Sequence, residues 1–246
     1  MSKSNREQGR AERAAAIQAA HARAERNRRI AIGGAVVVVL AIIAAAVFWY
    51  SGGSGGSSTA TTKDVAKLHP RAGDHSLVIG PKSAKDHVVV YEDFLCPYCR
   101  EFETASRDFL HADAAKGLVE VEYRPFHLLQ DDYSTRALNA FAEVLSESPG
   151  VAMKFHDLLY DKQPYEAAAN KPNASQLADW AASVGADKSK VEAAVNAADP
   201  AFETAANAAA QKANVQGTPT VYLNGKQVQG SATQIADQLE TQIAKK

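Results

Sequence analysis

Two cysteines separated by two residues are the only thiols in this chain of 246 residues, and they lie in the segment Cys96-Pro97-Tyr98-Cys99. At the start of a helix, cysteines at this spacing can close a disulfide with little movement of the backbone. The unpaired N–H groups and the dipole of the helix N-terminus would stabilise a thiolate on the first sulfur and lower its pKa. We therefore expect Cys96 to be the exposed nucleophile and Cys99 to be the shielded resolving thiol.

The dipeptide between the cysteines sets the geometry of the pair, and Tyr98 offers an apolar surface beside the sulfurs. Two alternatives use the same residues. A Cys-x-x-Cys pair can be half of a zinc site, but no second cysteine pair exists and no His-x₃₋₅-His spacing follows the motif. The other alternative is an inert structural disulfide. We favour redox chemistry, which needs no metal and no organic cofactor beyond the Cys96–Cys99 disulfide.

Charge is unevenly distributed along the chain. Residues 1–29 carry eight Lys and Arg against three Asp and Glu, a net charge of +5, whereas residues 51–246 carry 19 against 25, a net charge of −6. A mildly acidic globular part lacks the basic surface that nucleic-acid binding requires. We therefore exclude nucleic acid as a partner.

Residues 30–50 form an apolar stretch of 21 residues without a charged side chain. As a helix it would be about 31 Å long, which matches a hydrocarbon core of roughly 30 Å. Three arginines precede it and Trp49 and Tyr50 end it, a pattern that predicts a cytoplasmic N-terminus. We expect a single-pass membrane anchor. A cleaved signal peptide is the alternative, but the apolar core of such a signal is usually shorter.

The anchor divides the rest of the chain. Residues 1–29 form a basic cytoplasmic segment, and residues 51–62 form a linker rich in Gly and Ser, whose average span would be about 19 Å. Residues 63–246 form the domain that carries the cysteines, which we expect at the outer surface of the cell membrane.

The first half of this domain reads as strand, helix and strand. Strands are expected at Leu77–Ile79, Val88–Tyr91 and Val119–Tyr123, where apolar residues run together or alternate with polar ones. A helix is expected from about residue 96 to 113, between the last two strands. Strands joined in this way lie parallel, through a right-handed crossover.

The second half begins with a helical insertion at about residues 130–213. Apolar residues recur there at helical spacing, one helix is expected to end at Gly185, and Asp199-Pro200 reads as an N-cap followed by proline at the first helical position. Two short strands then flank the turn Asn224-Gly225, and a closing helix is expected from Ser231.

Two segments resemble the signature regions of the DsbA-like family of the thioredoxin superfamily, namely residues 88–102 (VVVYEDFLCPYCREF) and residues 217–225 (GTPTVYLNG). The resemblance covers about residues 77–246, including the helical insertion. It implies an α/β thioredoxin fold, a βαβ half and a ββα half with helices inserted between them. It also implies that Thr218-Pro219 is a cis peptide beside the dithiol, where Thr218 binds an extended substrate segment.

The sequence departs from the family pattern near the nucleophile. Many relatives place a buried acid six residues before it to move protons to the resolving cysteine, whereas this chain has Val90 there. Asp93 and Glu92 could take that role, and a surface or capping role is the alternative for both. The dipeptide is Pro-Tyr, where the best-known oxidase of the family has Pro-His, and Thr218 stands where valine is usual. Both differences bear on the redox potential.

These observations predict a membrane-anchored thiol–disulfide oxidoreductase. We expect an oxidase that introduces disulfides into unfolded or reduced secreted and surface proteins. We also expect a quinone-linked partner in the same membrane to reoxidise this enzyme. An extracytoplasmic reductase is the nearest alternative. A non-catalytic binding module with the same fold is the more distant one.

Overall fold

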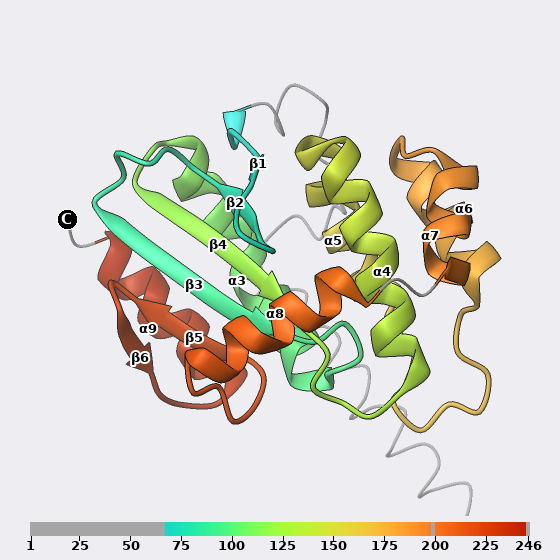
Figure 1. Cartoon of the computed structure of the whole chain (residues 1–246). Coiled ribbons are helices and arrows are strands. Elements are labelled where there is room, and N and C mark those ends of the chain that lie inside the picture. Colours follow the sequence, from blue (N-terminus) through green and yellow to red (C-terminus); the bar gives the residue numbers. More distant parts are fainter. Residues whose placement is uncertain (1–66, 198–199, 245–246) are drawn as a thin grey trace, which may run out of the picture. The chain divides into compact units, whose positions relative to one another are not determined.

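Six strands in the described part of the chain form one sheet, in the order β1-β2-β4-β3-β5-β6 (Figure 1). Strands β3 and β4 are parallel, whereas every other pair of neighbours is antiparallel. The strands are β1 (Arg71–Ala72), β2 (Leu77–Ile79), β3 (Asp86–Glu92), β4 (Val119–Pro125), β5 (Thr220–Leu223) and β6 (Lys226–Val228).

The computed structural model describes residues 67–197 and 200–244. All of them belong to one compact unit that runs from Thr59 to Lys246. The predicted cytoplasmic segment, the anchor at residues 30–50 and the linker at residues 51–62 lie outside the described residues. None of the helices that the structure describes is both long and apolar enough to cross a membrane.

The predicted βαβ unit is present. Helix α3 (Pro97–Ala115) connects β3 to β4, and the register pairs Val88 with Val121 and Val90 with Tyr123. All four of these side chains are buried because they lie on the face of the sheet that α3 covers. Only the two-residue strand β1 had not been predicted, since so short an element leaves no periodic pattern.

The helical insertion comprises five helices among the described residues. Helices α4 to α7 pack against one another, and α5 also contacts α3. Helix α8 contacts α4 and lies across the other face of the sheet (Figure 1). The helices are α4 (Asp132–Glu147), α5 (Pro149–Asp161), α6 (Ala174–Val184), α7 (Lys188–Ala197) and α8 (Ala201–Lys212).

The predicted start of α8 was one residue too early. Pro200 is the N-cap, with φ −79° and ψ 2°, and the helix begins at Ala201. The Pro200 carbonyl accepts the first helical hydrogen bond, from the Thr204 N–H at 2.7 Å. The predicted N-cap, Asp199, lies outside the described residues. The end of α6 at Gly185 is as predicted, and the glycine adopts a left-handed φ of 111°.

The ββα half closes the sheet. Asn224 and Gly225 have φ of 52° and 78°, the conformation of the two-residue hairpin turns that favour Asn-Gly. Helix α9 (Ala232–Ala244) follows and packs against α3 with Ile235 and Leu239 buried. With this half in place, the chain has the thioredoxin fold and helical insertion that the resemblance implied.

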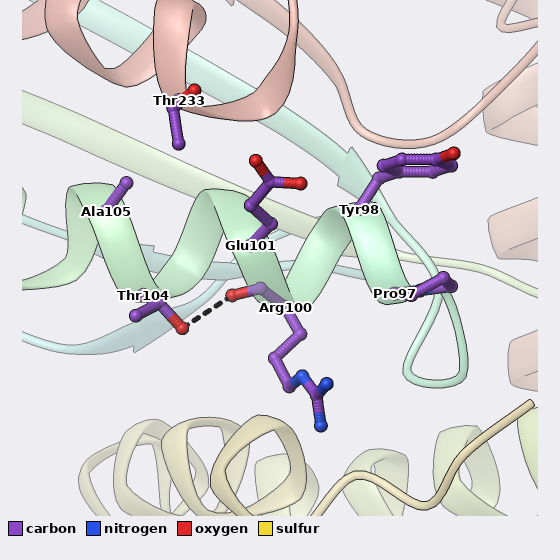
Figure 2. Close-up of a pocket in the computed structure, with 7 residues that line it drawn as sticks. All are labelled: Pro97, Tyr98, Arg100, Glu101, Thr104, Ala105 and Thr233. Atoms are coloured by element: carbon purple, nitrogen blue, oxygen red, sulfur yellow. Dashed lines mark hydrogen bonds between the residues drawn. The ribbon is translucent and has the colours of Figure 1, made fainter. Parts of the chain in front are cut away.

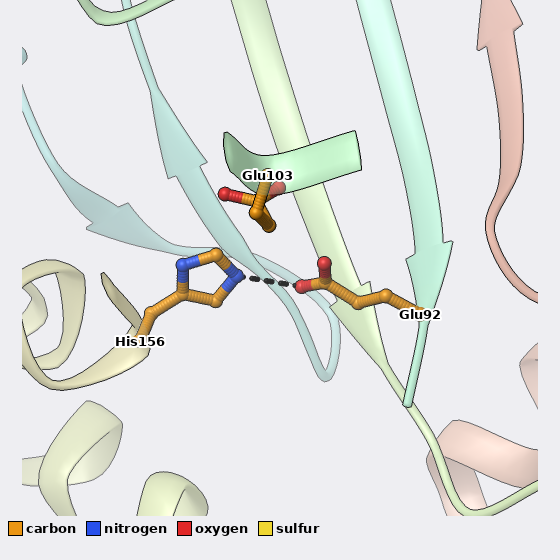
Figure 3. Close-up of side chains that lie close together, drawn as sticks. All are labelled: Glu92, Glu103 and His156. Atoms are coloured by element: carbon orange, nitrogen blue, oxygen red, sulfur yellow. Dashed lines mark hydrogen bonds and ion pairs between the residues drawn. The ribbon is translucent and has the colours of Figure 1, made fainter. Parts of the chain in front are cut away.

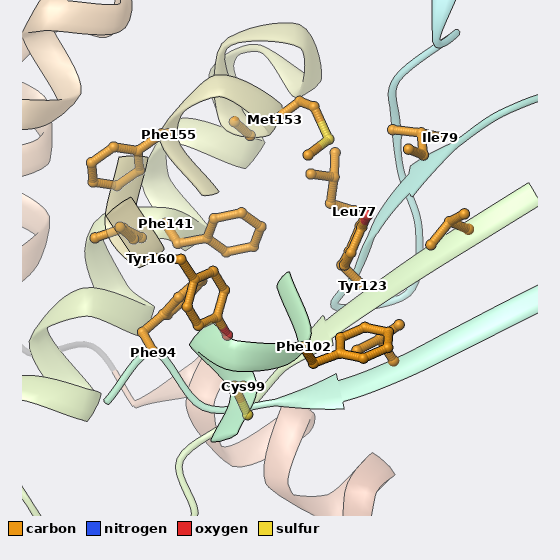
Figure 4. Packing of buried hydrophobic residues seen from close by; sticks show 14 of the residues in the cluster. Leu77, Ile79, Phe94, Cys99, Phe102, Tyr123, Phe141, Met153, Phe155 and Tyr160 are labelled. Carbon is orange, nitrogen blue, oxygen red and sulfur yellow. The ribbon is translucent and has the colours of Figure 1, made fainter. Parts of the chain in front are cut away.

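An aromatic core joins the dithiol to the insertion (Figure 4). Phe94, in the loop between β3 and α3, lies 5.4 Å from Phe141 of α4 and 5.5 Å from Tyr160 of α5, measured between ring centroids. Cys99 and Phe102 of α3 belong to the same cluster. Burial of side chains this large stabilises the fold by about 1.5–3 kcal/mol each. The insertion is therefore part of the core on which the dithiol rests.

Candidate active site

The two cysteines begin helix α3. Cys96 is the N-cap residue, with extended backbone angles, and Pro97 occupies the first helical position, where the missing N–H costs nothing. Both cysteines are free thiols. The prediction that Cys96 is exposed was wrong, since only 4% of its surface is accessible. Cys99, one turn further along, is completely buried.

The pKa of the Cys96 thiol is lowered to about 6. The largest cause is a hydrogen bond from the Cys99 thiol, which outweighs the opposing effect of burial. A hydrogen bond from the Thr218 side chain and the backbone N–H groups of Cys99 and Tyr98 lower the pKa further. The N–H groups of the first turn thus contribute as predicted, but the neighbouring thiol contributes more. In its protonated form, Cys96 donates to the Thr218 carbonyl at 3.4 Å.

The pKa of Cys99 moves in the opposite direction. Burial raises it well above the usual value, and the hydrogen bond that Cys99 donates to Cys96 and the negative charge on Cys96 raise it further. Glu92 adds a smaller effect of the same sign. At neutral pH the pair therefore consists of a Cys96 thiolate and a neutral Cys99 thiol, which lies one turn further along α3.

Thr218 and Pro219 lie beside this pair, immediately before β5. The bond between them is cis, as the resemblance implied. Strand β5 is the antiparallel neighbour of β3, which leads directly into the Cys96 loop. The adjacency of β3 and β5 thus brings residues 122 positions apart into contact at the sulfur.

An open groove of about 510 Å³ runs along α3 next to the dithiol (Figure 2). Tyr98 is 65% exposed at one end of it and Thr233 of α9 lies at the other. The lining combines an aromatic ring and small side chains with one acidic and one basic group, which suits an extended polypeptide of mixed composition. The lining residues are Pro97, Tyr98, Arg100, Glu101, Thr104, Ala105 and Thr233.

Asp93 and Glu92 are both fully buried, so the alternative of a surface role was wrong. The Asp93 carboxylate accepts four hydrogen bonds between 2.7 and 2.9 Å, and these occupy both of its oxygens. These hydrogen bonds hold the loop before α3 and the segment that leads into α4 together. The donors are the N–H groups of Leu95, Leu128 and Leu129 and the hydroxyl of Ser134.

Glu92 belongs to a different group, which it forms with Glu103 of α3 and His156 of α5 (Figure 3). All three side chains are fully buried. The His156 Nε2 atom lies 2.7 Å from one Glu92 oxygen. The other Glu92 oxygen and both Glu103 oxygens have no hydrogen-bond partner among the residues that the structure describes. Sequence patterns had suggested only Glu92 of these three.

The charges in this group depend on one another. Burial raises the pKa of Glu103 to about 8, so its carboxyl is protonated at neutral pH. Burial disfavours the His156 imidazolium, but the charge of Glu92 and hydrogen bonds to Asp157 and Glu92 outweigh it and raise the pKa to about 10. The His156 imidazolium and the neutral carboxyl of Glu103 therefore lie close together beside Glu92.

Among the described residues, this is the one group whose donor atoms, within 4.8 Å of one another, could hold a metal ion. The positive charge that a cation would supply is already present. His156 is charged, and the Arg107 Nε atom lies 3.8 Å from a Glu103 oxygen. We interpret Glu92, Glu103 and His156 as an ionic cluster.

Comparisons with known proteins agree with this geometry. A family model described as Thioredoxin matches residues 73–245. Serine/threonine-protein kinase PknE of Mycobacterium tuberculosis is 28% identical over 164 residues, which cover 62% of this chain but only 29% of the kinase. Disulfide bond formation protein D of Bacillus subtilis is 30% identical over 166 residues, 63% of this chain and 70% of that protein. The crystal structure of reduced DsbA from Mycobacterium tuberculosis superposes with a TM-score of 0.59 at 27% identity, covering 71% of this chain and 94% of that one.

Replacement of Cys99 by alanine tests the origin of the low pKa. Because the Cys99 thiol is the largest cause, we expect the pKa of Cys96 in Cys99→Ala to rise above 6 towards its ordinary value of 9. The measurement is the rate of alkylation of the reduced protein by iodoacetamide as a function of pH. In the wild type, Cys96 alone should react, with a midpoint near pH 6. An unchanged midpoint in the variant would assign the effect to the helix N-terminus, and preferential labelling of Cys99 would reverse the two roles.

Proposed function

The chain belongs to the thioredoxin family and, within it, to the DsbA-like group, and from that membership we propose that it is a thiol–disulfide oxidoreductase with Cys96 and Cys99 as its redox-active pair. One observation carries the proposal. The Cys96 thiol, whose pKa is lowered to about 6, is in hydrogen-bonding contact with the Cys99 thiol, whose pKa is raised. This asymmetry is what a dithiol needs to exchange disulfides in a defined order.

The proposed reaction begins with a substrate thiolate that attacks Cys96 of the oxidised enzyme. The Cys96–Cys99 bond breaks, Cys99 leaves with the electron pair and takes up a proton, and a mixed disulfide forms between the substrate and Cys96. A second substrate thiolate then attacks the substrate sulfur of this bond, and Cys96 leaves as a thiolate. Two substrate thiols become one disulfide, and the enzyme gains two electrons. A leaving thiolate with a pKa of about 6 favours the second step.

The direction that we propose is oxidation of unfolded or reduced secreted and surface proteins. A stabilised Cys96 thiolate favours the reduced enzyme, which makes its disulfide a strong oxidant. The groove beside Tyr98 and the backbone of Thr218 are suited to an extended substrate segment. A quinone-linked membrane partner would reoxidise the enzyme. The reaction would need no cofactor other than the disulfide itself.

The redox state in cells tests this direction. After acid quenching and alkylation, most of the protein should carry the Cys96–Cys99 disulfide, and its reduction potential should lie above about −200 mV. In an insulin-reduction assay the purified protein should be active and Cys96→Ser inactive. A reduced steady state with a potential near that of thioredoxin, roughly −270 mV, would support the reductase instead. Absence of redox activity both in cells and in the insulin assay would favour the non-catalytic binding module.

We further propose that Glu92 receives the proton of Cys99 when that thiol has to become a nucleophile, as in the resolution of a mixed disulfide. Asp93 is already saturated with hydrogen bonds, whereas one buried oxygen of Glu92 is unpartnered. Glu92 also lies close enough to Cys99 for its charge to raise the pKa of that thiol. A buried carboxylate next to a buried thiol can act as a general base.

Glu92→Gln tests this role. The amide cannot accept the proton, so resolution of a preformed mixed disulfide at pH 7 should slow by about tenfold or more. The deficit should shrink as the pH rises, because hydroxide replaces the missing base. Stopped-flow kinetics between pH 6 and 9 measure it, with Asp108→Asn, which removes an exposed acid of α3, as the control. Equal rates for Glu92→Gln and wild type at every pH would remove Glu92 from the proton path.

The proposed location is the outer face of the cell membrane. The apolar length of residues 30–50 and the charge difference across them support a single-pass anchor, and a linker that spans about 19 Å would keep the dithiol near a membrane oxidase.

Alkaline carbonate extraction tests the anchor. Full-length protein should stay in the membrane pellet, whereas a variant that lacks residues 1–50 should be extracted. An exposed hydrophobic helix of 21 residues is stable only in a bilayer, which is the reason for the expected difference. Release of the full-length chain, or a mature chain that begins after residue 44, would contradict the anchor and favour a cleaved signal.

A further inference from the structure

Gln163 is bonded directly to the segment that carries the nucleophile. It follows α5 in the helical insertion and is only 7% exposed. Its amide nitrogen Nε2 donates to the carbonyl of Phe94 and to the carbonyl of Cys96, each at 3.0 Å. A side-chain amide has two N–H donors, so this contact uses both of them.

The two carbonyls flank Leu95 and belong to the last turn of chain before α3. The Cys96 carbonyl also accepts the first bonds of that helix, from the N–H groups of Cys99 at 3.1 Å and Arg100 at 3.2 Å. Cys96 itself caps the helix without any side-chain hydrogen bond to a backbone N–H. Within the described structure, the Gln163 side chain therefore binds the backbone of Cys96 from the segment that follows α5.

Gln163 is itself held in place. Its backbone N–H donates to the carbonyl of Tyr160 at 3.2 Å, and the Tyr160 ring packs 5.5 Å from that of Phe94. The end of α5 thus contacts the Cys96 loop through one aromatic pair and one amide. A buried amide bonded to two buried carbonyls is costly to lose, because each unpaired group then retains its full desolvation penalty.

We propose that Gln163 is a positioning residue for Cys96, which holds the sulfur where the Cys99 thiol and Thr218 can donate to its thiolate. The proposal rests on the function proposed above for the dithiol. The amide of Gln163 binds backbone carbonyls. It acts by fixing the backbone from which Cys96 projects, and so it sets how well the two donors reach the thiolate.

Gln163→Met tests the proposal because methionine keeps most of the volume and removes both donors. With the reduced full-length protein in detergent, the alkylation rate of Cys96 at pH 6 should fall by about threefold or more, since the thiolate is the reactive species. Insulin reduction at the same pH should slow in parallel. Gln176→Ala is the matched control, since it removes a glutamine from the capping box of α6 and should lower stability while leaving the alkylation midpoint unchanged.

The outcomes separate positioning from stability and from the proposed function. A wild-type midpoint in a folded Gln163→Met variant would overturn the positioning role. Equal shifts in Gln163→Met and Gln176→Ala would overturn it too, because they would report lost stability alone. Should Gln163→Met fail to fold, Gln163→Glu gives a second test, since its protonated carboxyl can donate one of the two bonds. A wild-type midpoint of Cys96 alkylation in Gln163→Glu would also overturn the positioning role. A wild-type protein whose Cys96 has an ordinary pKa and no insulin activity would contradict the dithiol function itself.

Discussion

The hydrogen bond between the two sulfurs is the interaction on which the site depends. It lowers the pKa of Cys96 to about 6, and its loss on ionisation of Cys99 helps to raise the pKa of that thiol. The bond exists only because Cys99 is buried and therefore stays neutral, and it stays buried because α3 packs its first turn onto the aromatic core. Redox asymmetry in this dithiol is thus a consequence of packing, and the helix N-terminus adds to it.

The helical insertion supports the dithiol through three further interactions. Asp93 fastens the Cys96 loop to the segment that leads into α4, and Gln163 fastens it to the end of α5. His156 of α5 supplies the cation that accompanies Glu92 beneath Cys99. A bare βαβ and ββα frame would leave these groups without partners. The insertion therefore forms the inner wall of the active site.

Local sequence signals predicted the parts of this site that depend on local geometry. Local patterns predicted the start of the helix at the two cysteines, the strands and the Asn224-Gly225 turn. The signature around Pro219 implied the cis bond. Contacts between residues some 35 to 70 positions apart carry no such signal. The Asp93 and Gln163 bonds and the near-complete burial of Cys96 arise only when the insertion packs on the loop. Glu103 could have been noticed, since it shares the inward face of α3 with Cys99 and Ser106 at helical spacing.

Charge balance explains why Glu92 and Asp93, adjacent in sequence and equally buried, differ in what they can do. Four fixed N–H and O–H donors occupy both oxygens of the Asp93 carboxylate. Glu92 is balanced by a titratable imidazolium and lies beside an acid that is already protonated. If Glu92 receives the proton of Cys99 as proposed, no isolated buried charge is created, whose cost would be many kcal/mol. The proposed role of Glu92 therefore depends on its partner His156 as well as on its burial.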